Sequence, residues 1–436
     1  MQCFLKGGNI MGECCCCHKE TNTSAGTLPQ GKNGECNCAG QEIDVIGKTA
    51  KADMQFEEEA VLLDTGAAVF EMPRIHRLTA YTKALWNLHK EVIDAVLDGG
   101  WDNETHPWHR ELQDFWRYPL AFCDYGMLSM AMIAPEMKDE IIEYARKTLL
   151  LMKDTPIWDE WIRFRFNDNP ITKDNIMYKG HLHFVYGVYQ LLSGSREFEE
   201  EYKALTEIIV RENLENSKSE MPYWGIQCEP DQYFPQCNSV GMMGLWIYDL
   251  IFGTNYNDEI SRNIYQFIFD HVSDKETGLL FAKYHPSHGI GEPYITGFCN
   301  SWGLTMLQPY NPEVLQGAYQ TFIHYFGKEL MDGKALYIKE YANFDEASTL
   351  TEESMGVFYA MALTKVYEDK EAWEKFSRYF IGTYGIKIID GTARFTKASP
   401  MDESFIHSYI LWGQVQQPWE KVLNYDWEAF RRGESI

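Results

Sequence analysis

Two cysteines, Cys228 and Cys237, lie nine residues apart in a segment whose residue types could carry out proton transfer or nucleophilic attack. Between them stand the carboxylate of Glu229 and the aromatic side chains of Tyr233 and Phe234. A thiol can protonate a leaving hydroxyl, accept a proton as thiolate, or add covalently to carbon. Free cysteine is also among the most buried residue types, so the spacing alone favours packing over catalysis. The spacing matches no common zinc site, and we expect no metal here.

A second candidate, His181, follows Asn169-Pro170 near the start of an apolar segment. At a helix N-terminus the helix dipole disfavours the imidazolium, which would lower the pKa of His181. A lone histidine on an apolar helix face is, however, more often a satisfied core residue than a catalytic one. The pattern alone therefore favours a structural role for His181, and His183 is a weaker candidate still.

The elements that must position these side chains are predicted to be helices. Leu78, Leu85, Val92 and their neighbours recur at three- and four-residue spacing, as on one helix face. Comparable patterns predict helices over residues 110–131, 136–152, 175–192, 197–212, 238–252, 258–272, 298–309, 312–327, 353–368, 370–381 and 402–414. Short β-like stretches are expected near 279–284 and 385–397. About twelve helices with few strands predict an all-α fold, a barrel in which inner helices are ringed by outer ones.

Two prolines, Pro230 and Pro235, argue against a helix through the cysteine segment. We therefore predict a shaped loop that leads into a helix starting at residue 238. That helix is apolar on nearly every face, which predicts a buried inner helix.

Composition narrows the possible partners of the chain. It has 436 residues, of which 45% are hydrophobic, and a formal net charge of −25. This acidic balance argues against nucleic acid or an anionic membrane surface as a partner, because both require basic patches. The sequence has neither an apolar run long enough to cross a membrane nor a signal-peptide pattern, so we expect a cytoplasmic protein with reduced thiols.

The first 55 residues differ from the rest of the chain. They are rich in Gly, Asn and Cys, and seven of the eleven cysteines precede residue 40. No helical or strand period is present, so we predict a poorly ordered Cys-rich tail over residues 1–55 and a single catalytic domain over 56–436. A zinc site or lipid attachment at Cys14–His18 is a weaker alternative to an inert tail.

Several ungapped motifs resemble the linalool dehydratase/isomerase family. They lie in the same order as in the family, at residues 176–182, 186–191, 228–234, 236–240 and 245–249. The resemblance runs from about residue 118 to 310. It implies an (α/α)6 barrel with a deep apolar pocket, no cofactor or metal, and a homo-oligomer, since the family archetype is a pentamer. The archetype interconverts geraniol and linalool and dehydrates linalool to myrcene.

The resemblance also assigns site residues by position. The catalytic set falls on Cys228, Cys237, His181 and Tyr118, and pocket walls fall on Met177 and Phe234.

The chain departs from the family at several polar positions. A family aspartate and tyrosine on the first helix align with Trp86 and Val92, and a further tyrosine becomes Phe298. Asp124, which replaces a small family residue, and Glu229 are candidates to supply a carboxylate at the pocket.

These observations predict a cofactor-independent lyase or isomerase that acts on a small apolar allylic alcohol. We expect this alcohol to be a terpenoid. The lost polar groups favour an alternative, an isomerase or cyclase that rearranges a larger terpenoid or another apolar intermediate. A non-catalytic binding protein and a sugar-active barrel are further alternatives. The latter would require paired carboxylates, which Glu229, Asp231 and Asp124 could supply.

Overall fold

The computed structural model describes residues 78–101, 113–154, 157, 169–171, 173–341 and 354–434. The chain divides into two units, Met1–Asp53 and Met54–Ile436. All described residues belong to the second unit, and the prediction for the tail lies outside them.

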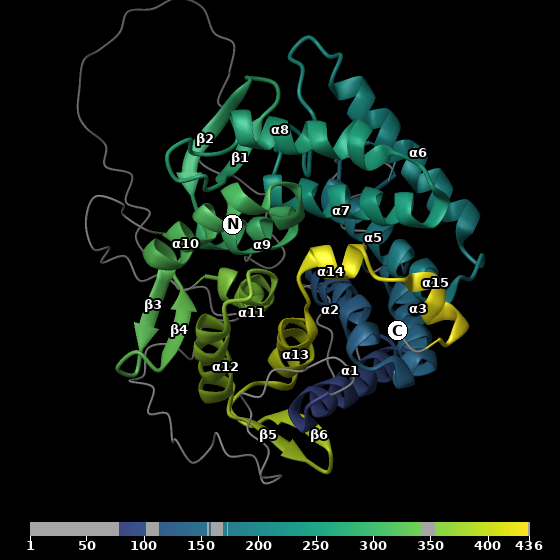
Figure 1. Ribbon diagram of the computed structural model, residues 1–436, viewed down its shortest axis with the longest axis vertical. Helices are drawn as coiled ribbons and strands as arrows, with labels where there is room; N and C mark the ends of the chain where they lie inside the picture. The colour runs from purple at the N-terminus through teal and green to yellow at the C-terminus, as the bar shows by residue number, and fades with distance from the viewer. Residues whose placement is uncertain are drawn as a thin grey trace, which may run out of the picture. The chain divides into compact units, whose positions relative to one another are not determined.

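A closed ring of helices forms the centre of the second unit. In chain order its members are α2 (Gln113–Ile133), α5 (Ile176–Ser193), α7 (Pro235–Phe252), α9 (Gly297–Leu307), α11 (Gly356–Val366) and α13 (Pro400–Val415). Each contacts the next, and α13 returns to α2 (Figure 1). The described residues of these helices are buried along most of their length, as expected for helices that are apolar on all sides.

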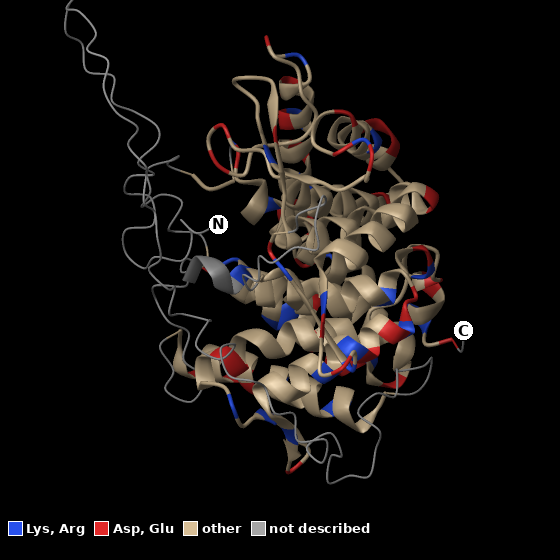
Figure 2. Cartoon of the chain, turned by 90° about the vertical axis from the view of Figure 1, so that its left-hand side faces the viewer, with Lys and Arg blue, Asp and Glu red and all other residues tan. Residues whose placement is uncertain are grey.

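A second set of helices packs on the outside of this ring (Figure 1). It consists of α1 (Ala80–Gly99), α3 (Lys138–Met152), α6 (Glu199–Asn216), α8 (Arg262–His271), α10 (Pro312–Phe326) and α12 (Lys370–Tyr384). These helices are amphipathic, and most of their charged residues are exposed or half-buried. Figure 2 marks the acidic and basic positions along the chain by colour. The described residues are mostly helical, with inner helices ringed by outer ones as predicted.

Short elements complete the described chain. They are η3 (Pro135–Met137), the π-turn η4 (Asn257–Ser261), η5 (Gln308–Tyr310), α14 (Trp419–Leu423) and α15 (Trp427–Arg432). None of the described helices combines the length and the apolar composition needed to span a membrane.

Three antiparallel hairpins each connect an outer helix to the next inner one. They pair β1 (Phe281–His285) with β2 (Ile290–Ile295), β3 (Gly327–Leu330) with β4 (Ala335–Ile338), and β5 (Ile386–Ile389) with β6 (Thr392–Phe395). The predicted stretch near 279–284 matches β1 but not β2, and the stretch at 385–397 covers both strands of the third hairpin. The second was missed because the apolar helix pattern over 312–327 runs directly into β3, whose first residue, Gly327, has an extended backbone.

The connections differ in length at the two ends of the ring. Those from inner to outer helices are short, as in residues 194–198 and 253–256. Those from outer to inner helices are long and include the hairpins and residues 217–234. The long loops therefore all lead to the N-terminal ends of inner helices, which is where the predicted site residues are found.

The boundary of α7 corrects one prediction. The helix begins at Pro235 rather than at residue 238, so Cys237 lies in its first turn and not in the preceding loop. Proline is tolerated at the first helical position because that N–H has no partner within the helix.

Candidate active site

The loop that carries Cys228 is fixed on two sides. Tyr233 and Tyr284 of β1 exchange backbone hydrogen bonds of 2.9 and 2.8 Å. Asn238 in α7 accepts a hydrogen bond from the backbone N–H of Ile226 (2.8 Å) and donates to its carbonyl (2.9 Å). Gly225, with φ +117°, allows the close approach, because a Cβ there would lie 2.3 Å from the Tyr233 ring. The loop is thus held to both the hairpin and the helix that follow it.

Cys228 and Cys237 are reduced, buried, and in hydrogen-bonding contact through their side chains. The backbone N–H of Phe234, at the start of α7, also contacts the Cys228 thiol and favours its thiolate. Burial is the larger effect, and it raises the pKa of Cys228 well above its ordinary value. Cys228 is therefore a protonated thiol at neutral pH and can donate a proton.

His181 lies in the second turn of α5 and is fully buried. Its Nδ1 is 2.5 Å from the hydroxyl of Tyr125, whereas Nε2 has no hydrogen-bond partner. The pKa of His181 is well below its ordinary value, first because of burial and second because of the nearby Arg117 guanidinium. The direction agrees with the sequence-based expectation, but the cause is burial and not the helix dipole. His181 is neutral at physiological pH and can accept a proton.

Aromatic rings enclose these groups. Tyr118 and Phe122 from α2 and Trp302 from α9 each lie with ring centroids within 5.5 Å of the His181 ring. Trp302 stacks on Tyr359 of α11 at 5.4 Å. Arg117 donates to the Tyr118 hydroxyl at 3.2 Å. The structure therefore brings Tyr118 and His181 together, as the family resemblance implied.

Further contacts between aromatic side chains join α13 to the same cluster. Phe122 is 5.6 Å from Tyr409 and 5.0 Å from Trp412, both on α13. Tyr359 and Tyr409 meet edge to face at 5.4 Å. Residues of α2, α5, α9, α11 and α13 thus share one aromatic cluster. Tyr359 also interacts electrostatically with Cys237 of α7.

The expected pocket-wall residues lie at this end of the ring. Met177 is buried in the first turn of α5, and Phe234 is half-buried at the N-cap of α7. Phe298, also half-buried, contacts Trp302 and Tyr359. Glu229 is buried beside Cys228 and accepts a hydrogen bond from the Gln232 side chain at 2.8 Å.

Asp124 lies on a different side of α2 from the aromatic cluster. It follows the inward-facing Phe122 by two residues, which is roughly half a turn of an α-helix. It is fully buried, and neither carboxylate oxygen has a hydrogen-bond partner. Burial raises the pKa of Asp124 well above its ordinary value and so favours the protonated carboxyl. The structure does not bring Asp124 to His181 or to the thiols.

The two first-helix positions, Trp86 and Val92, lie in the outer helix α1. Trp86 is buried, stacks on His89 and donates to Glu140 of α3. Val92 is buried in the same helix.

Sequence reasoning missed four residues near the site. Tyr125 follows Tyr118 by seven residues, so helical periodicity could have placed it on the same face. Tyr359 and Tyr409 lie beyond the stretch in which the family motifs were recognised, and no local pattern marks them. Glu340 follows β4 and is also unmarked in the sequence.

The buried carboxylate of Glu340 holds the N-terminus of α9. It accepts hydrogen bonds from the Phe298 N–H (3.2 Å) and from the Ser354 hydroxyl. Burial raises the pKa of Glu340 to about 7, against the opposing effect of these donors. Glu340 also interacts electrostatically with Cys299, a buried thiol that donates to Gln236 Oε1 at 3.2 Å.

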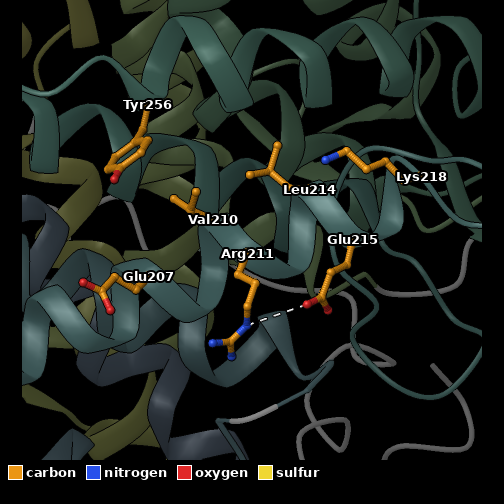
Figure 3. A pocket seen from close by; sticks show the side chains of 7 residues that line it. All are labelled: Glu207, Val210, Arg211, Leu214, Glu215, Lys218 and Tyr256. Carbon is orange, nitrogen blue, oxygen red and sulfur yellow. Dashed lines mark ion pairs between the residues drawn. The ribbon is translucent and has the colours of Figure 1, made fainter.

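Two other features of the described residues were compared with the predicted site, namely possible metal ligands and a pocket on the surface. Among the described residues no cluster of three or more His, Cys, Asp or Glu side chains could hold a metal ion. A surface pocket of about 380 Å³ lies along α6 (Figure 3) and contains none of the predicted site residues. Its lining residues are Glu207, Val210, Arg211, Leu214, Glu215, Lys218 and Tyr256.

Comparison with solved structures finds distant likenesses. The GH76A α-1,6-mannanase from Salegentibacter sp. HEL1_6 is 13% identical, with a TM-score of 0.48, over 77% of this chain and 98% of that one. The Lin0763 protein from Listeria innocua is 10% identical, with a TM-score of 0.49, over 78% of this chain and 97% of that one.

Sequence comparison is more specific. The family described as linalool dehydratase/isomerase matches residues 117–401, well over half of the 436-residue chain. The match includes both cysteines, His181 and Tyr118, and it extends past the recognised motifs to take in Glu340 and Tyr359. The chain belongs to the linalool dehydratase/isomerase family.

Proposed function

We propose that the protein is a cofactor-independent lyase or isomerase that removes or moves the hydroxyl of an apolar allylic alcohol, of terpenoid type. Family membership supports a lyase or isomerase. The observation that carries the finer proposal is the joint burial of a protonated thiol, Cys228, and a neutral imidazole, His181, at one aromatic end of the helix ring.

The two groups have complementary proton chemistry. Hydroxide is a poor leaving group, so an acid must protonate the alcohol oxygen before the C–O bond breaks. The Cys228–Cys237 pair gives this proton, and water leaves with the bonding electron pair. His181 Nε2 then takes a proton from the neighbouring carbon, whose C–H electrons form the new double bond. In an isomerisation, water instead adds to the other end of the allylic system and returns a proton.

The aromatic cluster suits the charge that develops on the substrate. The faces of Phe122, Trp302 and Tyr359 exclude water and attract a delocalised allylic cation. Tyr118, hydrogen-bonded to Arg117, offers a hydroxyl that can orient the alcohol oxygen.

A second candidate function is cyclisation or rearrangement of a larger apolar substrate. The observation that favours it is Phe298, an apolar ring at the position where the family resemblance implies a tyrosine. With fewer polar groups to hold a hydroxyl, the cation would persist long enough to rearrange.

The test is turnover by the purified protein on acyclic and cyclic allylic alcohols, with products identified by mass spectrometry. We expect C228A and H181A each to lower kcat by about 100-fold or more. Cys123→Ala is the matched control, since Cys123 is also a buried thiol with a raised pKa. If C228A and H181A both stay within about threefold of the parent while the parent turns over, the acid–base assignment is wrong. Cyclic products from an acyclic alcohol would favour the second candidate.

A further inference from the structure

Tyr125 lies beside His181, the base of the proposed function. It is fully buried in α2, one helical turn after Phe122. Its ring stacks on Phe184 with a centroid distance of 4.0 Å, which fixes the ring plane. Its hydroxyl oxygen lies 2.5 Å from His181 Nδ1.

This contact leaves the other imidazole nitrogen available. Nε2 of His181 has no hydrogen-bond partner, and the ring is parallel to that of Tyr125 within 2°. A hydrogen bond at Nδ1 fixes both the ring orientation and the tautomer, as second partners of functional histidines generally do. Nε2 is therefore the atom presented to a substrate.

Several titratable groups act on the Tyr125–His181 contact and on the thiols. Cys237 and Asp124 interact electrostatically with Tyr125, and Arg117 acts on His181. Cys228 is in hydrogen-bonding contact with Cys237 and interacts electrostatically with Glu229. Burial, Asp124 and Cys237 all raise the pKa of Tyr125, so the hydroxyl retains its proton between turnovers.

We propose that Tyr125 is the positioning residue for His181. The Nδ1–H of the neutral imidazole donates to the Tyr125 oxygen, which leaves Nε2 unprotonated and available to the substrate. Without this hydrogen bond the imidazole can rotate or take up the tautomer that carries its proton on Nε2, and the base of the proposed elimination is lost. This inference rests on the proposed function for its purpose, although the contact itself does not.

The decisive variant is Tyr125→Phe, which keeps the ring and its stacking on Phe184. We expect kcat to fall by about 100-fold, with KM within about twofold of the parent and a shifted kcat–pH profile. Tyr202→Phe is the matched control, because Tyr202 is also fully buried and its hydroxyl has no hydrogen-bond partner. Its kcat–pH profile should superimpose on that of the parent.

A second readout does not require turnover. In protein labelled with ¹⁵N-histidine, the Nδ1 resonance of His181, assigned with a His181→Gln variant, should move in Y125F and stay in place in Y202F. An unmoved resonance, or a Y125F kcat within twofold of the parent, overturns the inference. If the parent converts no alcohol, the proposed function fails, and the Nδ1 resonance alone then decides whether Tyr125 holds His181.

Discussion

The conformation of the loop that carries Cys228 depends on hydrogen bonds made by Asn238. Asn238→Ala should show how much these bonds contribute to stability. Asn238 is buried and makes hydrogen bonds to the Ile226 N–H, the Ile226 carbonyl (2.9 Å) and the Phe234 carbonyl (3.0 Å). Ile226 is fully buried, so alanine leaves both of its backbone groups without a partner. At about 1–3 kcal/mol for each of these two groups, the free energy of unfolding should fall by about 2–6 kcal/mol.

Asn238→Ala should also loosen the loop itself, in addition to lowering the stability of the whole fold. Without the Asn238 hydrogen bonds, the loop can open without unfolding the barrel, and an alkylating agent should reach Cys228 sooner. Urea unfolding would measure the stability, and mass spectrometry of alkylated peptides would measure the labelling rate of each cysteine.

Asn300 provides the matched control. It makes the same three contacts one inner helix later, to the Leu280 N–H (2.7 Å), the Leu280 carbonyl (2.9 Å) and the Thr296 carbonyl (3.0 Å). Asn300→Ala should cost a similar free energy but should accelerate labelling of Cys299 and not of Cys228. The reasoning is refuted if N238A unfolds within about 0.5 kcal/mol of the parent, or if both variants expose the same cysteine.

Three further predictions concern buried charged groups and the aromatic residue Phe298. Folding raises the pKa of Glu340 from 4.5 to about 7, so the free energy of unfolding should fall by about 3 kcal/mol as pH rises between these values. Urea unfolding followed against pH would measure this loss, which should be absent in E340Q. Lys179 and Glu212 form a buried ion pair, so K179M should lower the unfolding free energy by about 3–5 kcal/mol; a loss below 1 kcal/mol would show that Glu212 is satisfied by its other contacts. F298Y should raise kcat/KM on allylic alcohols by restoring a hydroxyl, with little change in thermal stability, and unchanged or lower kcat/KM would argue against a polar role at this position.

The sequence allowed much of the helical architecture to be predicted because inner and outer helices have different burial patterns. The apolar character of α7 on all faces and the acidic solvent face of α6 both follow from periodicity. The start of α7 was misplaced because Pro235 was read only as a helix breaker, although proline also suits the first helical position.

The site was predictable only where residues are close in sequence or match a known motif. Cys228, Cys237 and His181 fall in such motifs. Tyr359 and Tyr409 come from the last two inner helices, and only closure of the ring brings them to Phe122. Similarly, the raised pKa of Glu340 results from burial under distant segments, which no local pattern encodes.

Because the connections differ in length, the two ends of the helix ring have different roles. At one rim, short turns such as residues 194–198 have no room for insertions and serve mainly to keep neighbouring helices together. At the other, long loops and hairpins lead to the N-terminal turns of the inner helices; one of these loops carries Cys228, and the helical turns carry Cys237 and His181. Changes in loop length or composition at that rim can therefore alter which molecules enter while leaving the helices in place. A family built on this plan can diversify its substrates without redesigning its core.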